Sequence, residues 1–269
     1  MFQKILLGIY KLICRTGLLN TSAGQKIFYK FYFLYKEFYE AKNSNYLKRY
    51  VPQGSSVVDV GANAGFFTKK FANWVSEGGK VLAFEPDESN VRQLKVYVKK
   101  LIEKVILVDG AAGNRNGTVE FQLDRYHPAG HRINIKSSAT SKHNETDKRN
   151  IIKVKSYTID EVLNRNQNLF SQISLIKIDV QGAEKMVLEG AEETINKFHP
   201  SLFVEIDEEA LNEYGTNTTE IIEMLKSRNY TPFYIDKKNK LQEIDIKVLS
   251  KILDKREYID LLFLQNITS

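Results

Sequence analysis

Residues 57–68 read Val57-Val58-Asp59-Val60-Gly61-Ala62-Asn63-Ala64-Gly65-Phe66-Phe67-Thr68. The β-branched residues at the start predict a buried strand, and a helical pattern begins at Phe66. Between strand and helix, two glycines with the spacing G-x-x-x-G form a turn. Glycine lets a backbone approach a ligand closely, and the free amides at a helix start attract polar or anionic groups. A nucleotide-like ligand is therefore expected here, in contact with Asp59, Gly61, Ala62, Asn63, Gly65 and Phe66.

The next expected strand also ends on an acidic residue, Glu85, which lies 20 residues after Gly65. In Rossmann-like folds a carboxylate at this place accepts hydrogen bonds from both ribose hydroxyls of a nucleotide. The alternative is that Glu85 only caps the following helix, which Pro86 and Asp87 would start. The glycine turn and the carboxylate together favour ribose binding by Glu85, with Pro86 beside it. The spacing G-x-G-x-x-G, typical of NAD-binding folds, is absent from this turn.

Two later strand ends carry residues that a cofactor can use. Small residues follow the third expected strand and leave room for a flat base, although Asp-Gly is also a plain turn pair. We expect a base to contact Asp109, Gly110 and Ala111. Asp179 ends the fourth main strand before another glycine turn. Since ligands of open α/β sheets bind at the carboxyl ends of the strands, Asp179 should face the same crevice as Asp59 and Glu85.

Strands and helices alternate after the turn at residues 52–54, which predicts a parallel sheet with helices on both faces. The expected helices span residues 66–75, 87–101, 157–163, 183–198 and 218–228. Residues 117–123 and 151–154 are expected as an antiparallel addition. We predict an α/β, Rossmann-like fold with a mostly parallel seven-stranded sheet, in which the last two strands pair with each other. Its strands are 56–60, 80–84, 105–109, 173–180, 200–206, 231–235 and 258–265.

Residues 1–50 are expected to form an N-terminal helical arm, and residues 51–269 a second unit that contains the expected ligand site. The arm is expected to hold helices at 2–16 and 24–47, and residues 28–35 are unusually aromatic with lysines interleaved. These helices either cap the core or lie in a membrane interface, where aromatic and lysine side chains mix well. The polar residues 124–150 show no period and are expected to form a lid, a binding loop or a disordered segment.

The charge, cysteine count and apolar runs of the chain argue against several classes of protein and site. The net charge is +6 and the pI is about 9.1, but no basic run of the kind expected in a nucleic-acid binder is present. Cys14 is the only cysteine, so an internal disulfide and a cysteine metal cluster are excluded. No apolar run reaches the roughly 18 residues that span a bilayer. Because residues 21–23 are a poor cleavage site for a signal peptide, we expect an uncleaved cytoplasmic chain, with peripheral membrane contact through the arm as an open alternative. The oligomeric state is undetermined.

The four motifs DVGANAGFFT, FEPD, IKIDVQGAE and HPSLFVEID, in this order and spacing, resemble the FkbM family of methyltransferases that use S-adenosylmethionine (SAM). The resemblance covers residues 57–206. It implies the class I methyltransferase fold, SAM as cofactor, and methylation of a hydroxyl on a sugar, glycan or secondary metabolite. The usual family form of the third motif is D-x-E-G-x-E: Asp179 and Glu184 match it, whereas Gln181 replaces the first glutamate. A His-Arg pair in the loop of some members suggests acceptor contacts from His131, Arg132 and Gln181.

Transfer of a methyl group to a hydroxyl requires a general base. The candidates are His131, Asp179, Glu184 and Glu205. The carboxylates Asp179, Glu205 and Asp207 could hold Mg²⁺, but such strand-end carboxylates are common without metals, and we expect none. Two other functions stay open: a SAM-binding protein without turnover, which the change at Gln181 allows, and a nicotinamide-dependent oxidoreductase.

Overall fold

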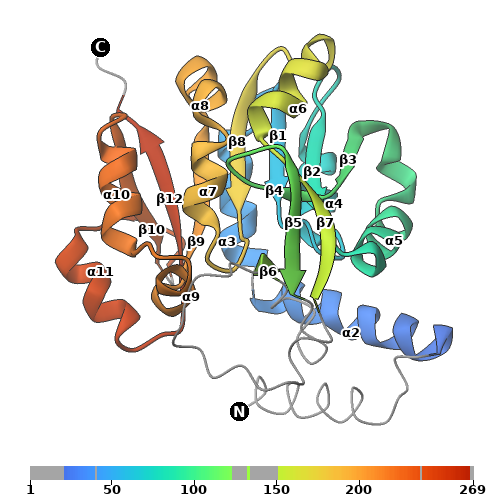
Figure 1. Cartoon of the computed structure of the whole chain (residues 1–269), viewed down its shortest axis with the longest axis horizontal. Coiled ribbons are helices and arrows are strands. Elements are labelled where there is room, and N and C mark those ends of the chain that lie inside the picture. The colour runs from blue at the N-terminus through green and yellow to red at the C-terminus, as the bar shows by residue number, and fades with distance from the viewer. Residues whose placement is uncertain (1–20, 40, 123–131, 134–150, 237, 267–269) are drawn as a thin grey trace.

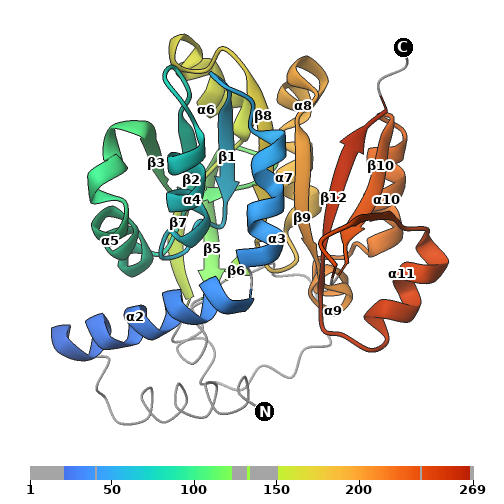
Figure 2. The same cartoon turned by 180° about the vertical axis from the view of Figure 1, so that it is seen from behind.

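Strand β1 (Ser56–Val60) is buried along its whole length, as a central strand of a parallel sheet must be. It pairs in parallel with β2 (Val81–Glu85) on one side and with β8 (Ile173–Ile178) on the other. β3 (Val105–Asp109) and β9 (Ser201–Ile206) extend this parallel part outward. The computed structural model describes residues 21–39, 41–122, 132–133, 151–236 and 238–266 of the chain. Figures 1 and 2 show the sheet from its two sides.

The sheet has eight strands, in the order β11-β10-β12-β9-β8-β1-β2-β3, and the prediction of seven is wrong by one. The added strand, β11 (Leu241–Glu243), has three residues, too few to show an alternating pattern. It pairs antiparallel with β10 (Tyr230–Ile235), which pairs antiparallel with β12 (Ile259–Gln265), as expected for the last two predicted strands. Helix α11 (Ile246–Leu253), which the pattern did not predict, lies between β11 and β12 in the sequence.

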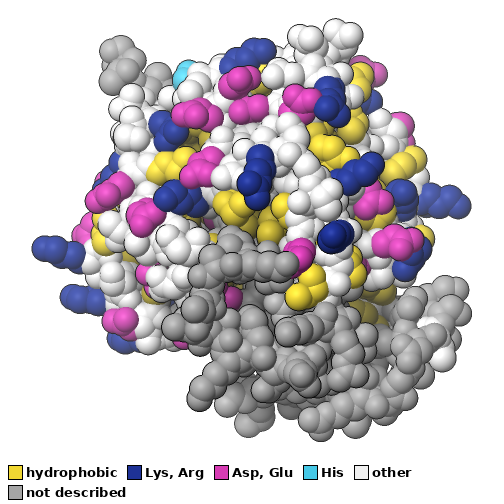
Figure 3. Space-filling view, viewed as in Figure 1, with side chains coloured by type: hydrophobic (Ala, Val, Ile, Leu, Met, Phe, Trp, Pro, Cys, Tyr) yellow, Lys and Arg dark blue, Asp and Glu magenta, His cyan; other side chains and the backbone are white. Residues whose placement is uncertain are grey.

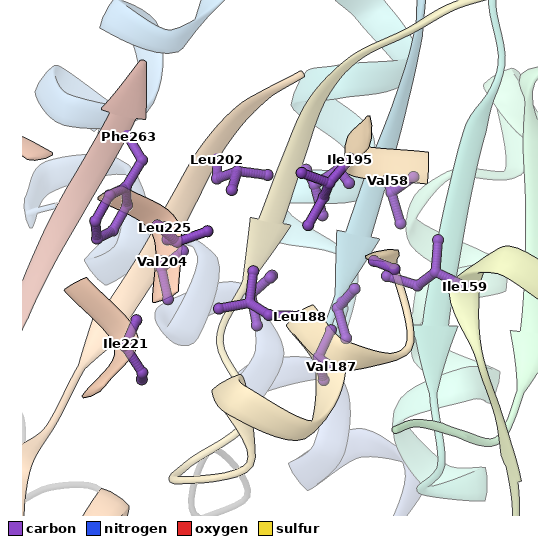
Figure 4. Close-up of a cluster of buried hydrophobic side chains, with 14 of the residues drawn as sticks. Val58, Ile159, Val187, Leu188, Ile195, Leu202, Val204, Ile221, Leu225 and Phe263 are labelled. Carbon is purple, nitrogen blue, oxygen red and sulfur yellow. The ribbon is translucent and has the colours of Figure 1, made fainter. Parts of the chain in front are cut away.

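Each face of the sheet carries its own hydrophobic core, because alternate residues of a strand point to opposite faces. Val58 and Val60 of β1 belong to one core, which helices α6 (Ile159–Arg165), α7 (Glu184–Glu189), α8 (Glu192–Phe198) and α10 (Thr218–Lys226) cover. Figure 4 shows how the apolar side chains of this core interdigitate. Val57 belongs to the opposite core, which α4 (Phe66–Trp74) and α5 (Glu88–Tyr97) cover.

Side chains cap three helix starts, among them the one at Asp87, where the sequence predicts that a helix begins. The side chains of Asp87, Thr158 and Asn217 each accept a hydrogen bond from a backbone amide of the first turn that follows. The single helix predicted at 183–198 is two helices, α7 and α8. They separate at Gly190, where a Cβ atom would lie 2.0 Å from the carbonyl oxygen of Gly113. A further short helix, α9 (Glu208–Glu213), follows β9.

A second sheet has the order β4-β7-β5-β6. β5 (Gly117–Gln122) pairs antiparallel with β7 (Ile151–Tyr157), which confirms the expected antiparallel addition. The two-residue strands β4 (Ala111–Ala112) and β6 (Arg132–Ile133) complete it. The remainder of the predicted loop at 124–150, including His131, lies outside the described residues.

The N-terminal arm lies across one end of the large sheet. Helix α2 (Ser22–Tyr39) runs along the edge toward which β1 points, and α3 (Ala41–Tyr46) and the turn η2 (Leu47–Tyr50) lead from it to β1 (Figures 1 and 2). The single helix predicted for 24–47 is thus divided, and the helix predicted for 2–16 lies outside the described residues. None of the helices in the described part of the chain has the length and apolar character that crossing a bilayer requires. The remaining short turns are η3 (Lys99–Lys104) and η5 (Gln167–Leu169).

Candidate active site

The strand order reverses between β1 and β8, whose carboxyl ends lie at the same edge of the sheet. From β1 the chain proceeds outward to β2 and β3, and later returns on the other side of β1 as β8. Ligands of open α/β sheets bind where the strand order reverses in this way. At this point the Asp179 amide donates to the Val60 carbonyl at 3.2 Å. The turns that follow the two strands are in close contact, because a Cβ at Gly61 would lie 1.9 Å from the Asp179 carbonyl oxygen.

The glycine turn is held by hydrogen bonds from neighbouring strands. The amides of Gly61 and Ala62 both donate to the Phe84 carbonyl, at 3.2 and 3.0 Å. Gly61 and Gly65 have φ of 74° and 94°, and Asn63 has 49°, so the turn contains three left-handed residues. Phe66, which follows Gly65, packs in the core under the turn. The turn is therefore shaped before any ligand binds.

Glu85 closes the turn from the neighbouring strand. Its Oε2 atom accepts from the Asn63 amide at 2.7 Å, and its Oε1 atom accepts from the Asp87 amide at 2.9 Å and the Asn90 side chain at 3.2 Å. A carboxylate offers about four acceptor positions, so these bonds leave about one for a ribose hydroxyl where two were expected. Burial raises the pKa of Glu85 to about 7, against the lowering effect of its three donors. The carboxyl thus changes charge close to neutral pH.

The expected base-binding segment adjoins this carboxyl. The Gly110 amide donates to the Glu85 carbonyl at 3.2 Å. Asp109 ends β3 with its side chain exposed, whereas Ala111 is buried. Pro86 lies between Glu85 and the capping residue Asp87. All the predicted cofactor residues therefore lie at the carboxyl ends of β1, β2, β3 and β8.

A buried ion-pair cluster lies beneath the crevice, with Lys177 at its centre. Because β1 and β8 pair with Asp59 opposite Lys177, the two side chains stand on the same face of the sheet. The Lys177 ammonium is 3.1 Å from Asp179 Oδ2 and 3.7 Å from Asp59 Oδ1, and it donates to the Gly61 carbonyl at 3.1 Å. The other oxygen of Asp59 accepts from the Thr68 hydroxyl at 2.6 Å. Lys177 therefore binds both acidic strand ends and the glycine turn.

The pKa values in this cluster move in different directions. Burial raises the pKa of Asp59 more than Lys177 lowers it. Burial acts in the same sense on Asp179, but the charges of Lys177 and Lys36 outweigh it, so the pKa of Asp179 falls. Although burial disfavours the ammonium, Asp179 and Asp59 raise the pKa of Lys177. Asp179 is therefore held as a carboxylate and is a weak base.

Gln181 joins Asp179 to Glu205 on the neighbouring strand. Its Nε2 atom donates to Glu205 Oε2 at 2.6 Å and to Asp179 Oδ1 at 3.3 Å. Its own backbone is left-handed, with φ of 55°. A glutamate here would place a third carboxylate against two others. The amide instead supplies a donor to both, which is a physical reason for the departure from the family pattern.

Glu205 is a much weaker acid than an ordinary glutamate. Burial raises its pKa well above the usual value, and the charges of Asp179 and Asp260 raise it further. Asp260 lies opposite Glu205 in the β9–β12 pairing, and both line a cleft. Three aromatic rings, from Phe67, Phe203 and Tyr258, and two lysines, Lys36 and Lys177, share the lining of this cleft.

Two of the predicted acidic residues serve other contacts. Glu184 is buried, and its Oε1 atom accepts from the amides of Val180 and Gly182 at 3.1 and 3.2 Å, which holds the turn after β8. Burial raises its pKa to about 7. Asp207 caps helix α9 by accepting from the Ala210 amide at 3.0 Å. Glu184 and Asp207 are thus engaged with backbone amides.

The sequence reading missed Lys177, Asp260 and Lys36. Lys177 stands in the otherwise apolar run LIKI at residues 175–178, and a single charge in such a run is a signal that a buried partner exists. Asp260 and Lys36 carry no comparable local signal, because only the strand order and the path of α2 bring them to the cleft. Of the two residues in the predicted His-Arg pair, Arg132 lies in β6 and His131 is outside the described residues.

Known proteins resemble this chain over most of its length. Residues 59–232 match the family described as methyltransferase FkbM domain. Among curated proteins no sequence matches the chain. The similar solved structures include an FkbM methyltransferase from Methylobacillus flagellatus KT, with 14% identity and a TM-score of 0.45 over 79% of this chain and 44% of that one. A putative rRNA methylase from Clostridium thermocellum has 11% identity and a TM-score of 0.47, covering 83% and 93% of the two chains.

Proposed function

Because the chain belongs to the FkbM family of SAM-dependent methyltransferases, we propose that it transfers the methyl group to a hydroxyl, and that Glu205 accepts the hydroxyl proton. The observation that carries this proposal is the pairing of Asp179 and Glu205. Lys177 keeps Asp179 ionised, and the negative charge of Asp179 raises the pKa of Glu205 toward the range in which a base is most effective. Gln181 fixes the distance between the two carboxyls.

The residues present fit SAM as the cofactor. Gly61 and Gly65 allow the left-handed turn to pack closely against the Asp179 carbonyl and Leu94, and Glu85 keeps an acceptor position for a ribose hydroxyl. When bound, SAM would supply a methyl group on a positively charged sulfur. A nucleophile can bond to the methyl carbon while the sulfur leaves as a neutral thioether. Asp59 and Asp179 place two carboxylates near the glycine turn, against the single positive charge of Lys177. The excess negative charge favours a positively charged sulfur beside this turn. The protein's part in the reaction is then to hold the acceptor oxygen in line and to take its proton.

The lining of the cleft supports a polyhydroxylated acceptor, such as a sugar. Among the rings, Tyr258 is exposed and offers apolar surface for C–H faces, and Glu205 and Asp260 offer acceptors for hydroxyl groups. A hydroxyl is a poor nucleophile until its proton is accepted, which is why a base beside the cleft matters for oxygen acceptors in particular.

Replacing Glu205 by glutamine is expected to lower kcat by about 10²–10⁴-fold and to leave the affinity for SAM within about threefold. In the wild type, activity should rise with pH as Glu205 loses its proton, and this rise should be absent from the E205Q variant. Transfer of labelled methyl from SAM to a panel of sugars, amines and thiols measures both effects. Glu209→Gln, an exposed glutamate on α9, is the matched control.

Methyl transfer to amines or thiols alone would contradict oxygen as the acceptor atom. SAM binding without transfer to any acceptor of a broad panel would favour a binding protein without turnover. An E205Q variant with wild-type kcat would remove Glu205 from the reaction.

Replacing Glu85 by glutamine is expected to weaken SAM binding about 10- to 100-fold, because hydrogen bonds to a charged group contribute about 1.5–3 kcal/mol. The ionised carboxyl is the better acceptor, and its pKa is about 7. SAM affinity should therefore rise between mildly acidic and mildly alkaline pH in the wild type and stay level in E85Q. Calorimetric titration with SAM measures this, with Glu88→Gln on the exposed side of α5 as the control. Equal affinities in E85Q and wild type would exclude Glu85 from the cofactor site.

A further inference from the structure

Helix α2 has two faces with different contacts. Tyr29, Phe33 and Lys36 follow each other at spacings of four and three, so they share one face. Phe33 stacks on Tyr97 of α5 with 3.6 Å between ring centroids, and Lys36 lines the cleft beside Asp179. Burial and the nearby charges of Asp87 and Glu85 raise the pKa of Tyr29, on the same face, to about 12. This inner face of α2 therefore covers the edge of the sheet where the site lies.

The opposite face of α2 carries an exposed apolar stripe. Ile27, Phe31 and Leu34, again at spacings of four and three, are 48%, 51% and 53% exposed. Each of these residues lies two positions before a residue of the inner face, and a step of two positions turns a helix by about 200°. The stripe therefore points away from the inner face. Lys30, also exposed, stands beside the stripe. Large apolar side chains in a row on one face, next to a lysine, are typical of a helix that lies in a membrane interface.

The net positive charge of the chain is concentrated in the segment that contains this helix. Residues 1–50 hold nine Lys and Arg against two Asp and Glu, whereas residues 51–269 hold 30 against 31. On the face shown in Figure 3, basic and acidic side chains of the described residues are interspersed without a patch of one sign. An anionic surface would therefore attract the arm electrostatically, whereas residues 51–269, with almost balanced charges, would be attracted little.

We propose that the outer face of α2, formed by Ile27, Lys30, Phe31 and Leu34, docks on an anionic membrane surface. The stripe would enter the boundary between headgroups and acyl chains, and the lysine charge would strengthen the contact. Because the helix lies on the membrane and does not cross it, its inner face stays on the protein. The docked orientation places the edge of the sheet that carries the site next to the membrane.

Cosedimentation with vesicles tests the docking without any need for methyl transfer. The full chain is expected to sediment with vesicles of equal parts phosphatidylglycerol and phosphatidylcholine, to bind pure phosphatidylcholine far less, and to be released by salt. The variant with Phe31→Ser and Leu34→Ser should bind at least about tenfold more weakly. Lys30→Glu should bind roughly fivefold or more weakly. Val96→Ser, which changes a 71% exposed residue on α5, is the control and should bind as the wild type does.

Two results would overturn the proposal. One is a wild type that stays in the supernatant, or a double variant that binds anionic vesicles as tightly as Val96→Ser. The other is a dimer in sedimentation velocity that the double variant loses, without vesicle binding by the wild type, which would assign the stripe to a second copy of the chain. Unchanged thermal unfolding and unchanged SAM affinity of the double variant would show that its fold and cofactor site are intact.

Discussion

Replacing Lys177 by methionine is expected to destabilise the protein by about 3–5 kcal/mol, because it leaves Asp59 and Asp179 without their buried counter-charge. Asp59 is fully buried and Lys177 is 3% exposed, so water cannot take the place of the ammonium. The loss should be measured as a lower midpoint in urea unfolding. Part of it should return when Asp59→Asn is added, since the double variant has one uncompensated charge fewer.

Lys185 provides the matched control for this prediction. Its ion pair with Glu220 is as short as 2.6 Å but lies at the surface, with side chains 34% and 41% exposed. Exposed pairs contribute about 0–1 kcal/mol, so Lys185→Met should hardly change the midpoint. If the two methionine variants unfold at the same urea concentration, the buried cluster does not have the stabilising role that its geometry indicates.

Gly61→Ala should abolish SAM binding and destabilise the protein by more than about 3 kcal/mol. The added Cβ would lie 1.9 Å from the Asp179 carbonyl oxygen, a backbone atom that cannot turn away as a side chain can. The left-handed φ of 74° adds about 1–2 kcal/mol for any residue with a Cβ. Relief of the clash requires the turns after β1 and β8 to separate, which opens the crevice. Calorimetric titration with SAM and urea unfolding measure the two effects.

Gly78→Ala is the control that measures the cost of a left-handed backbone conformation without a steric clash. Gly78 also has a left-handed φ, of 86°, but a Cβ there would meet no atom within 4 Å. Its replacement should cost only the conformational part, about 1–2 kcal/mol, and should leave SAM binding unchanged. Equal losses at the two glycines would mean that close contact between the turns is not what requires Gly61.

Much of the fold was predictable because its signals are local. The alternation of β-branched runs with helical patterns placed the parallel strands of the large sheet, and Asp87, Thr158 and Asn217 cap helix starts through short-range hydrogen bonds. Two features that the sequence did not predict have different causes. β11 is three residues long, and the break between α7 and α8 at Gly190 depends on a distant contact with Gly113.

The same distinction between local and long-range signals applies to the residues of the candidate site. The glycine turn and the acidic ends of β1, β2 and β8 are contiguous motifs, so the cofactor half of the site could be predicted from the chain alone. The acceptor half could not, because Glu205 and Asp260 meet only through the β9–β12 pairing, and Lys36 reaches the cleft only through the path of α2.

The sequence by itself determined that a SAM-dependent methyltransferase fold surrounds a glycine turn at Gly61 and Gly65, since the turn, the strand before it and the helix after it are one continuous segment. Only the tertiary structure decided how the charges of the site are compensated. Asp59 and Lys177 lie far apart in the chain and become neighbours when β1 and β8 pair in one register. A shift by one residue would turn Lys177 to the other face of the sheet, so the pairing, and no local pattern, sets the protonation of Asp179 and Glu205.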